Sequence, residues 1–213
     1  RTKLEGIRAL GADVRLTADY DEAERAAKDD GERSGSVFIS PYSHPKVIAG
    51  AGTVGLEIHE DCPDVGVVVV PVGGGGLISG IAIALESTRA SVVGIEAAAS
   101  CPFTQSLNAG RIVPIDVAPT IADGLAGNLD PDSMTFDIVR RLVARIDVVS
   151  EPEIRSALRG LVHEEHLIAE GAAAVGIAGA RGQRSTTSGG LPQKIVVILS
   201  GANIDDDTLR TII

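Results

Sequence analysis

The sequence predicts an α/β protein: a mostly parallel, twisted sheet with helices on both faces. Two observations carry this prediction. Apolar, β-branched runs alternate along the 213 residues with segments of helical periodicity, a pattern typical of right-handed β-α-β crossovers. The run from Val67 to Val70 is also unbroken, as expected for a strand that is buried on both faces of a parallel sheet.

A turn of four consecutive glycines, Gly73 to Gly76, follows that run and leads into an Ala-rich helical segment from Leu77 to Leu85. Such a turn lets several backbone N–H groups approach a phosphate at the positive end of the helix dipole. The turn lacks the Gly-Lys-Ser/Thr ending of a nucleoside-triphosphate loop and does not fit the dinucleotide fingerprint. The alternative is a tight turn without a ligand.

Composition narrows the class of protein. The formal net charge is -10 and aromatic residues make up only 2% of the chain, which argues against a nucleic-acid partner. Because aromatic residues are so few, the core must be made of aliphatic side chains. The two cysteines, Cys62 and Cys101, lack metal-type spacing and are expected to be free thiols in the cytoplasm. No segment reads as a membrane span or signal peptide. The absence of an initial Met suggests a chain entered partway through a fold, or a processed one.

The N-terminal part predicts two helices and two short strands. Leu4, Ile7 and Leu10 have helical spacing, and a glycine just beyond them is a typical C-cap. A charged surface helix is expected over residues 20–33. The segments 13–16 and 36–40 have the composition of strands. Proline-rich turn chemistry over 41–45 then indicates a crossing point between domains.

The remainder alternates helices and strands. Glycines within the helix expected over 47–60 would allow close packing against a neighbour. A connection over 111–133 is rich in turn-formers, and Ser150 with Glu153 forms a capping box. The loop over 181–193 is polar. The other expected helices are 102–109, 135–144, 152–166 and 171–180, and the other expected buried strands are 91–96, 147–149 and 194–199.

Three groups of candidate ligand-binding residues come directly after expected strands. They are the glycine turn, Glu96, and the segment from Ser200 to Asn203. In parallel sheets, ligands bind beyond the carboxyl ends of the strands. Because all three groups occupy that position, the sequence predicts one site at this edge of the sheet.

Several ordered motifs resemble those of serine/threonine dehydratases and serine racemases, which are pyridoxal-phosphate enzymes of fold type II with a tryptophan synthase β-like fold. The resemblance covers essentially the whole chain. The motifs are Ser43–Glu57, Pro71–Leu77, Thr120–Gly124, Ala169–Gly171 and Leu199–Asn203.

The resemblance implies roles for residues at these motifs. The glycines and Leu77 would hold the cofactor phosphate, and Ser200 would hydrogen-bond the pyridine nitrogen. Residues 1–45 would be the remainder of a small domain, and 46–213 the large cofactor-binding domain. The implied cofactor-binding residues are Gly73, Gly74, Gly75, Gly76, Leu77, Gly124, Glu170, Ser200, Gly201 and Asn203.

Two family features are missing. The Schiff-base lysine motif and the Ser-x-Gly-Asn-His motif do not occur, so the fold is expected to be incomplete and no catalytic residue is identified. The four lysines, at positions 3, 28, 46 and 194, lack the small-residue setting of a catalytic lysine. The family's divalent-cation site would use Glu96 and the carbonyl of Ser100 for Mg²⁺ or Ca²⁺, but Pro102 stands at the second carboxylate position.

The resemblance implies β-elimination of L-threonine or L-serine to a 2-oxo acid and ammonia in the intact enzyme. The 213-residue chain alone is expected to be inactive. The alternatives are a racemase or dehydratase acting on serine or hydroxyaspartate, and an inactive pyridoxal-phosphate or ligand-binding fragment. A homodimer or tetramer with a small amino-acid substrate is expected, without nucleic acid or membrane.

Overall fold

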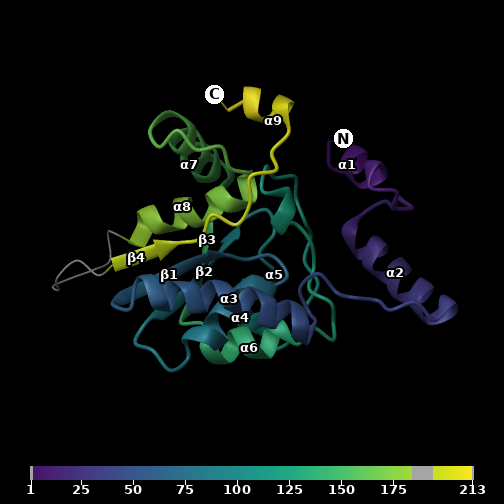
Figure 1. The fold of residues 1–213 in the computed structure, drawn as a ribbon, viewed down its shortest axis with the longest axis horizontal. Coiled ribbons are helices and arrows are strands. Elements are labelled where there is room, and N and C mark those ends of the chain that lie inside the picture. Colours follow the sequence, from purple (N-terminus) through teal and green to yellow (C-terminus); the bar gives the residue numbers. More distant parts are fainter. Residues whose placement is uncertain (1, 184–193, 213) are drawn as a thin grey trace.

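The computed structural model describes residues 2–183 and 194–212 (Figure 1). Helices and strands alternate through most of the chain, as the sequence predicts. In chain order the elements are α1 (Thr2–Ala9), α2 (Tyr20–Ser34), α3 (Pro45–Asp61), β1 (Val65–Pro71), α4 (Gly76–Leu85), β2 (Ser91–Ala97), α5 (Pro102–Ala109), the 3₁₀ turn η1 (Asp123–Leu125), α6 (Thr135–Leu142), β3 (Arg145–Val149), α7 (Glu151–His163), α8 (Gly171–Gln183), β4 (Lys194–Val197) and α9 (Asp206–Arg210).

The sheet has the strand order β3-β2-β1-β4, and every neighbouring pair is parallel. The predicted fold class is therefore confirmed. Parallel strands point the same way, so their carboxyl ends meet at one edge of the sheet. β1 lies between β2 and β4, and the turn that follows it emerges in the middle of that edge.

Helices cover both faces of the sheet (Figure 1). Val69 in β1 faces one core, to which α7 and α8 contribute, whereas Val68 and Val70 face a second core formed with α4, α5 and α6. All three valines are fully buried. Burial on both faces explains why β1 is an unbroken apolar run and not an alternating one.

The backbones of α3 and α4 approach each other without intervening side chains. A Cβ added at Gly80 would lie 2.4 Å from the Ile48 carbonyl oxygen and 2.5 Å from the Gly52 nitrogen, and one added at Gly55 would lie 2.8 Å from the Cβ of Ala84. The expected close packing of the glycine-containing helix is confirmed, and its neighbour is α4.

The two predicted N-terminal strands are wrong. Segments 13–16 and 36–40 form no strand, and Val37 and Ile39 are 84% and 58% exposed. The composition of these segments gives a local preference for the extended conformation. A strand also needs a neighbouring strand to pair with its backbone groups, and the described parts of the chain supply none. In Figure 1, α1 and α2 lie beside the α/β body, joined to it by the segment that leads into α3.

The C-terminal part differs from expectation in two places. β4 ends at Val197 and, within the described residues, pairs with β1 alone; Lys194 and Leu199 are exposed where a buried strand was predicted. The helix predicted over 152–166 ends at His163 as α7. Its capping box is confirmed, because the Glu153 carboxylate accepts the Ser150 N–H at 2.7 Å. Most of the predicted polar loop, 184–193, lies outside the described residues.

Among the helices of residues 2–183 and 194–212, none has the length and the apolar composition that crossing a membrane requires.

Candidate functional site

The glycine turn lies between β1 and α4 at the carboxyl edge of the sheet. Val72 continues the β1 direction, donating its N–H to the Ile95 carbonyl at 2.8 Å. The chain then turns, and Gly75 adopts φ +83 at the position before α4. Side chains disfavour this left-handed conformation, which makes glycine the suitable residue there.

The backbone donors of the turn have no partner among the residues that the structure describes. In the described chain, no acceptor pairs with the N–H groups from Gly73 through Ile78, and Ser79 is the next to donate, to the Gly75 carbonyl at 3.0 Å. Gly75 and Gly76 are buried, and a buried helix start whose donors lack partners is the usual arrangement for an anion. The donor set therefore fits a phosphate monoester.

Neighbouring groups leave no room for side chains in the turn. A Cβ at Gly74 would lie 2.3 Å from the ring of Tyr42, and a Cβ at Gly75 would lie 2.5 Å from the ring of Phe103. The turn is thus enclosed by α5 and by the segment that precedes α3. Glycine is required by contact at Gly74 and by both contact and conformation at Gly75.

A cavity of about 300 Å³ joins the turn to the η1 region. Its lining includes Tyr20, Tyr42, Gly74 and Gly124, so the structure brings two of the predicted cofactor-binding residues to one hollow. This volume is at the lower end of the range for small-molecule sites. A larger hollow of about 820 Å³ lies between residues 13–17 and α2. It contains none of the predicted site residues.

A second group of predicted residues meets beside this cavity. The Glu170 N–H donates to the Gly201 carbonyl at 3.1 Å. A Cβ at Gly201 would lie 2.4 Å from Oε1 of Glu170, and a Cβ at Gly124 would lie 3.7 Å from the same oxygen. The segments around 124, 170 and 201 therefore converge. Ser200 and Asn203 follow β4 and are exposed.

Glu96 serves as a helix cap. Its Oε1 accepts the Phe103 N–H at 2.8 Å, and its Oε2 accepts both the N–H and the hydroxyl of Thr104, at 2.9 and 2.7 Å. Burial raises the pKa of this carboxyl, and the three hydrogen bonds oppose that rise. The Ser100 hydroxyl pairs with the backbone of Gly127.

The expected Mg²⁺ or Ca²⁺ site finds no donor set to support it. Both carboxylate oxygens of Glu96 already accept N–H groups of α5. Among the residues that the structure describes, no group of three or more His, Cys, Asp or Glu side chains could hold a metal ion. The metal site thus stays a prediction without structural support.

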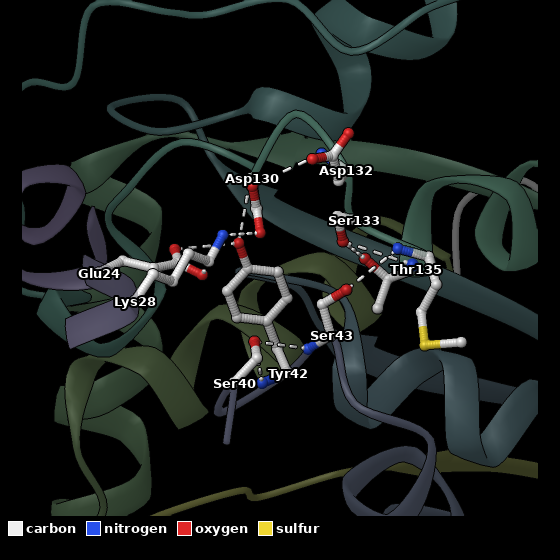
Figure 2. Close-up of polar contacts among 10 residues, drawn as sticks. Glu24, Lys28, Ser40, Tyr42, Ser43, Asp130, Asp132, Ser133 and Thr135 are labelled. Carbon is white, nitrogen blue, oxygen red and sulfur yellow. Dashed lines mark hydrogen bonds and ion pairs between the residues drawn. The ribbon is translucent and has the colours of Figure 1, made fainter. Parts of the chain in front are cut away.

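A polar cluster that the sequence analysis missed lies behind the turn (Figure 2). Tyr42 accepts the Asp130 N–H at 2.9 Å and donates to Glu24 at 3.4 Å, while Lys28 pairs with both Asp130 and Glu24. Burial is the main cause that raises the pKa of Tyr42 and that of Glu24. The cluster fixes the Tyr42 ring against Gly74. Glu24 and Lys28 are a local i,i+4 pair, but Tyr42 and Asp130 lie too far away in sequence for a local pattern to reveal their part in the cluster.

The described lysine side chains do not line the cavity. Lys28 belongs to the polar cluster, and Lys194 pairs with Asp64 at 2.6 Å on the exposed edge of the sheet. Lys46 is exposed on the first turn of α3. Lys46 and Lys194 are exposed, as expected of surface lysines, whereas Lys28 is partly buried and ion-paired where a solvated residue was expected.

Comparison with known proteins gives a consistent result. Residues 1–201 match the family described as "Pyridoxal-phosphate dependent enzyme". The L-threonine ammonia-lyase of Thermotoga maritima is 41% identical over 215 residues, which covers 100% of this chain and 52% of that protein. The chain thus spans about half the length of such curated relatives.

Solved structures are similar over nearly the whole chain. The processed form of threonine deaminase isoform 2 from Solanum lycopersicum has a TM-score of 0.89 and 34% identity, covering 99% of this chain and 62% of its own. Maize serine racemase has a TM-score of 0.86 and 31% identity, covering 99% and 66%. The described parts of the chain therefore share their architecture with both kinds of protein.

Proposed function

The chain belongs to the pyridoxal-phosphate-dependent enzyme family, and from this premise we propose that it is part of an ammonia-lyase that converts L-threonine or L-serine to a 2-oxo acid and ammonia. One observation supports the proposal: the N–H groups from Gly73 through Ile78, for which the described residues supply no acceptor, lie together at the carboxyl edge of the sheet, where Gly75 and Gly76 are buried. Such a donor set is suited to the phosphate of pyridoxal phosphate.

Each group of site residues has a proposed task. The N–H groups of the turn and of Leu77 bind the phosphate, and the α4 dipole adds to the attraction. The Ser200 hydroxyl donates to the pyridine nitrogen, and Asn203 lies on the same segment beyond β4. Glu170, held by Gly201 and close to Gly124, lies at the rim of the ring.

Bound pyridoxal phosphate supplies an electron-withdrawing ring that lets the amino acid lose its Cα proton and then its β-hydroxyl group. The choice of Ser200 as the nitrogen partner matters for this chemistry. A hydroxyl, unlike a carboxylate, does not stabilise a protonated pyridine nitrogen. The chain's own contribution therefore favours an elimination that needs only moderate electron withdrawal.

We propose that the Schiff-base lysine lies outside residues 1–213, because the described lysines are paired or exposed away from the cavity. Residues 1–45 would belong to a small domain and 46–213 to the large, cofactor-binding one. The position of α1 and α2 beside the α/β body supports this division (Figure 1). We propose a homodimer or tetramer. The proposed compartment is the cytoplasm, where free thiols such as those of Cys62 and Cys101 stay reduced.

A racemase is the second candidate, because maize serine racemase is similar over 99% of the chain. Both functions would use the phosphate cradle, by which we mean the N–H groups from Gly73 through Ile78 that are proposed to bind the phosphate. They differ in what happens after the Cα proton leaves. A dehydratase expels the β-hydroxyl, whereas a racemase returns a proton to the opposite face. L-Serine separates them, since one forms pyruvate and the other forms D-serine.

The test uses the natural polypeptide that contains residues 1–213. It is incubated with pyridoxal phosphate or with pyridoxal, which lacks the phosphate, and binding is measured by equilibrium dialysis. Borohydride then fixes any lysine adduct for peptide mass analysis, and 2-oxo acid and ammonia are measured with L-threonine and L-serine. The proposal expects preference for the phosphate form, a label outside residues 1–213 and 2-oxo acid production. Equal affinity for both compounds would rule out the proposed cradle.

A further inference from the structure

The carbonyl of Gly74 is held by a side chain from a distant part of the chain. The Thr135 hydroxyl donates to this oxygen at 2.8 Å, across a sequence separation of 61 residues. Thr135 is fully buried and is the first residue of α6. α6 therefore reaches back to the glycine turn at one defined atom.

Fixing this carbonyl also fixes a donor of the cradle. A trans peptide is planar, so the Gly74 carbonyl and the Gly75 N–H point in opposite directions, and the described residues contain no cis peptide. A peptide between two glycines rotates at little steric cost. The bond from Thr135 therefore holds the Gly75 N–H pointing away from α6.

The Thr135 hydroxyl is itself oriented. Its oxygen lies 2.7 Å from that of Ser133. Since the single hydroxyl proton of Thr135 is directed to Gly74, Ser133 must be the donor of this pair. Figure 2 shows Ser133 and Thr135 next to Ser43, whose hydroxyl accepts the Met134 N–H at 3.0 Å. Ser43 thus holds the backbone of Met134, the residue between Ser133 and Thr135.

We infer that Thr135, oriented by Ser133, is a positioning residue that aims the Gly75 N–H at the phosphate of the cofactor. This inference rests on the proposed function of the glycine turn. The residue does not touch the ligand; it prevents the Gly74–Gly75 peptide from rotating its N–H out of the cradle. Its loss should weaken binding of a phosphate-bearing ligand and leave the rest of the ligand's contacts unchanged.

The experiment measures the dissociation constants of pyridoxal phosphate and pyridoxal for the natural polypeptide and its variants. Thr135→Val keeps the shape and removes the hydroxyl, and Thr135→Ser restores the hydroxyl. We expect Thr135→Val to raise the Kd for pyridoxal phosphate about tenfold or more, the change that ~1.4 kcal/mol produces. The Kd for pyridoxal should stay the same, and Thr135→Ser should recover most of the loss. Ser133→Ala should give a smaller effect of the same kind.

Ser106→Ala is the matched control, because it removes a fully buried hydroxyl that accepts the Val113 N–H and is not bonded to the glycine turn. Because the Ser106 hydroxyl bonds Val113 and not the Gly74 carbonyl, this variant should leave the ratio of the two Kd values unchanged. Equal weakening of both ligands by Thr135→Val, or no weakening, would overturn the inference while leaving the proposed cradle intact. A wild-type protein that does not prefer the phosphate form would overturn the cradle and the inference together.

Discussion

Replacing Gly80 by alanine tests the contact between α3 and α4. The added Cβ would lie 2.4 Å from the Ile48 carbonyl oxygen and 2.5 Å from the Gly52 nitrogen. Ordinary van der Waals contact begins at 3.4 Å, so the two helices would have to separate by about 1 Å. The atoms in the way belong to the backbone of α3 and cannot rotate aside as a side chain can.

The expected cost follows from two opposing effects. Overpacking of this kind lowers the free energy of unfolding by up to about 3 kcal/mol, while the better helix propensity of alanine returns about 1 kcal/mol. Because the clashing atoms are backbone and cannot rotate aside, we expect the upper end of this range, a net loss of about 2 kcal/mol, which corresponds to a melting temperature lower by about 4–8 °C for a chain of this length. Equilibrium urea unfolding followed by circular dichroism measures the change directly.

Gly50→Ala is the matched control, since Gly50 lies on α3 and a Cβ there meets nothing within 4 Å. This variant should gain about 0.5–1 kcal/mol from helix propensity alone. The two substitutions are chemically identical and differ only in what the new methyl group meets. If Gly80→Ala proved as stable as wild type, the close approach of the helices would be refuted.

The remaining predictions concern single contacts, each measured by urea unfolding. Glu96→Gln should cost about 1–3 kcal/mol, because an amide nitrogen cannot accept an N–H of α5. Since burial raises the pKa of Glu96, the native state keeps this proton to higher pH than the unfolded chain. The wild type should therefore lose stability relative to Glu96→Gln as pH rises above 4.5, the ordinary pKa of a glutamate carboxyl; a difference that widens with pH would contradict this. Tyr42→Phe should cost about 1 kcal/mol by leaving the Asp130 N–H without its acceptor, and an unchanged midpoint would argue against that bond. Ser150→Ala should cost about 1 kcal/mol through its lost contact with Glu153, and a neutral result would remove the capping box from the energetics.

The sequence predicts the α/β body because its signals there are local and agree with one another. The run Val67 to Val70 is apolar on both faces and is followed at once by the glycine turn, so strand, turn and helix are each readable within a few residues. The pair of Ser150 and Glu153 likewise marks a helix start within one turn. These elements appear where they are expected.

The errors arise where structure depends on a partner. The segment 36–40 has the composition of a strand, but no described segment pairs with it. The hydrogen bonds of the Glu96 carboxylate to Phe103 and Thr104 were not predicted, because the sequence does not show where α5 begins relative to β2. The ion pair between Lys28 and Asp130 joins residues that lie 102 positions apart, so no local sequence pattern indicates it. Ser133 and Thr135 were detectable as polar residues at a helix start, although their contact with the turn was not.

The direct backbone contact between α3 and α4 has a mechanical consequence. Helices separated by side chains can slide, because the side chains change rotamer. Here Gly80 lies against the α3 backbone itself, so a displacement of α3 carries α4 with it. α4 begins at the glycine turn, and the segment before α3 joins that helix to α2. Movement of the N-terminal helices would therefore reach the turn through rigid backbone, without any residue of the turn changing its conformation.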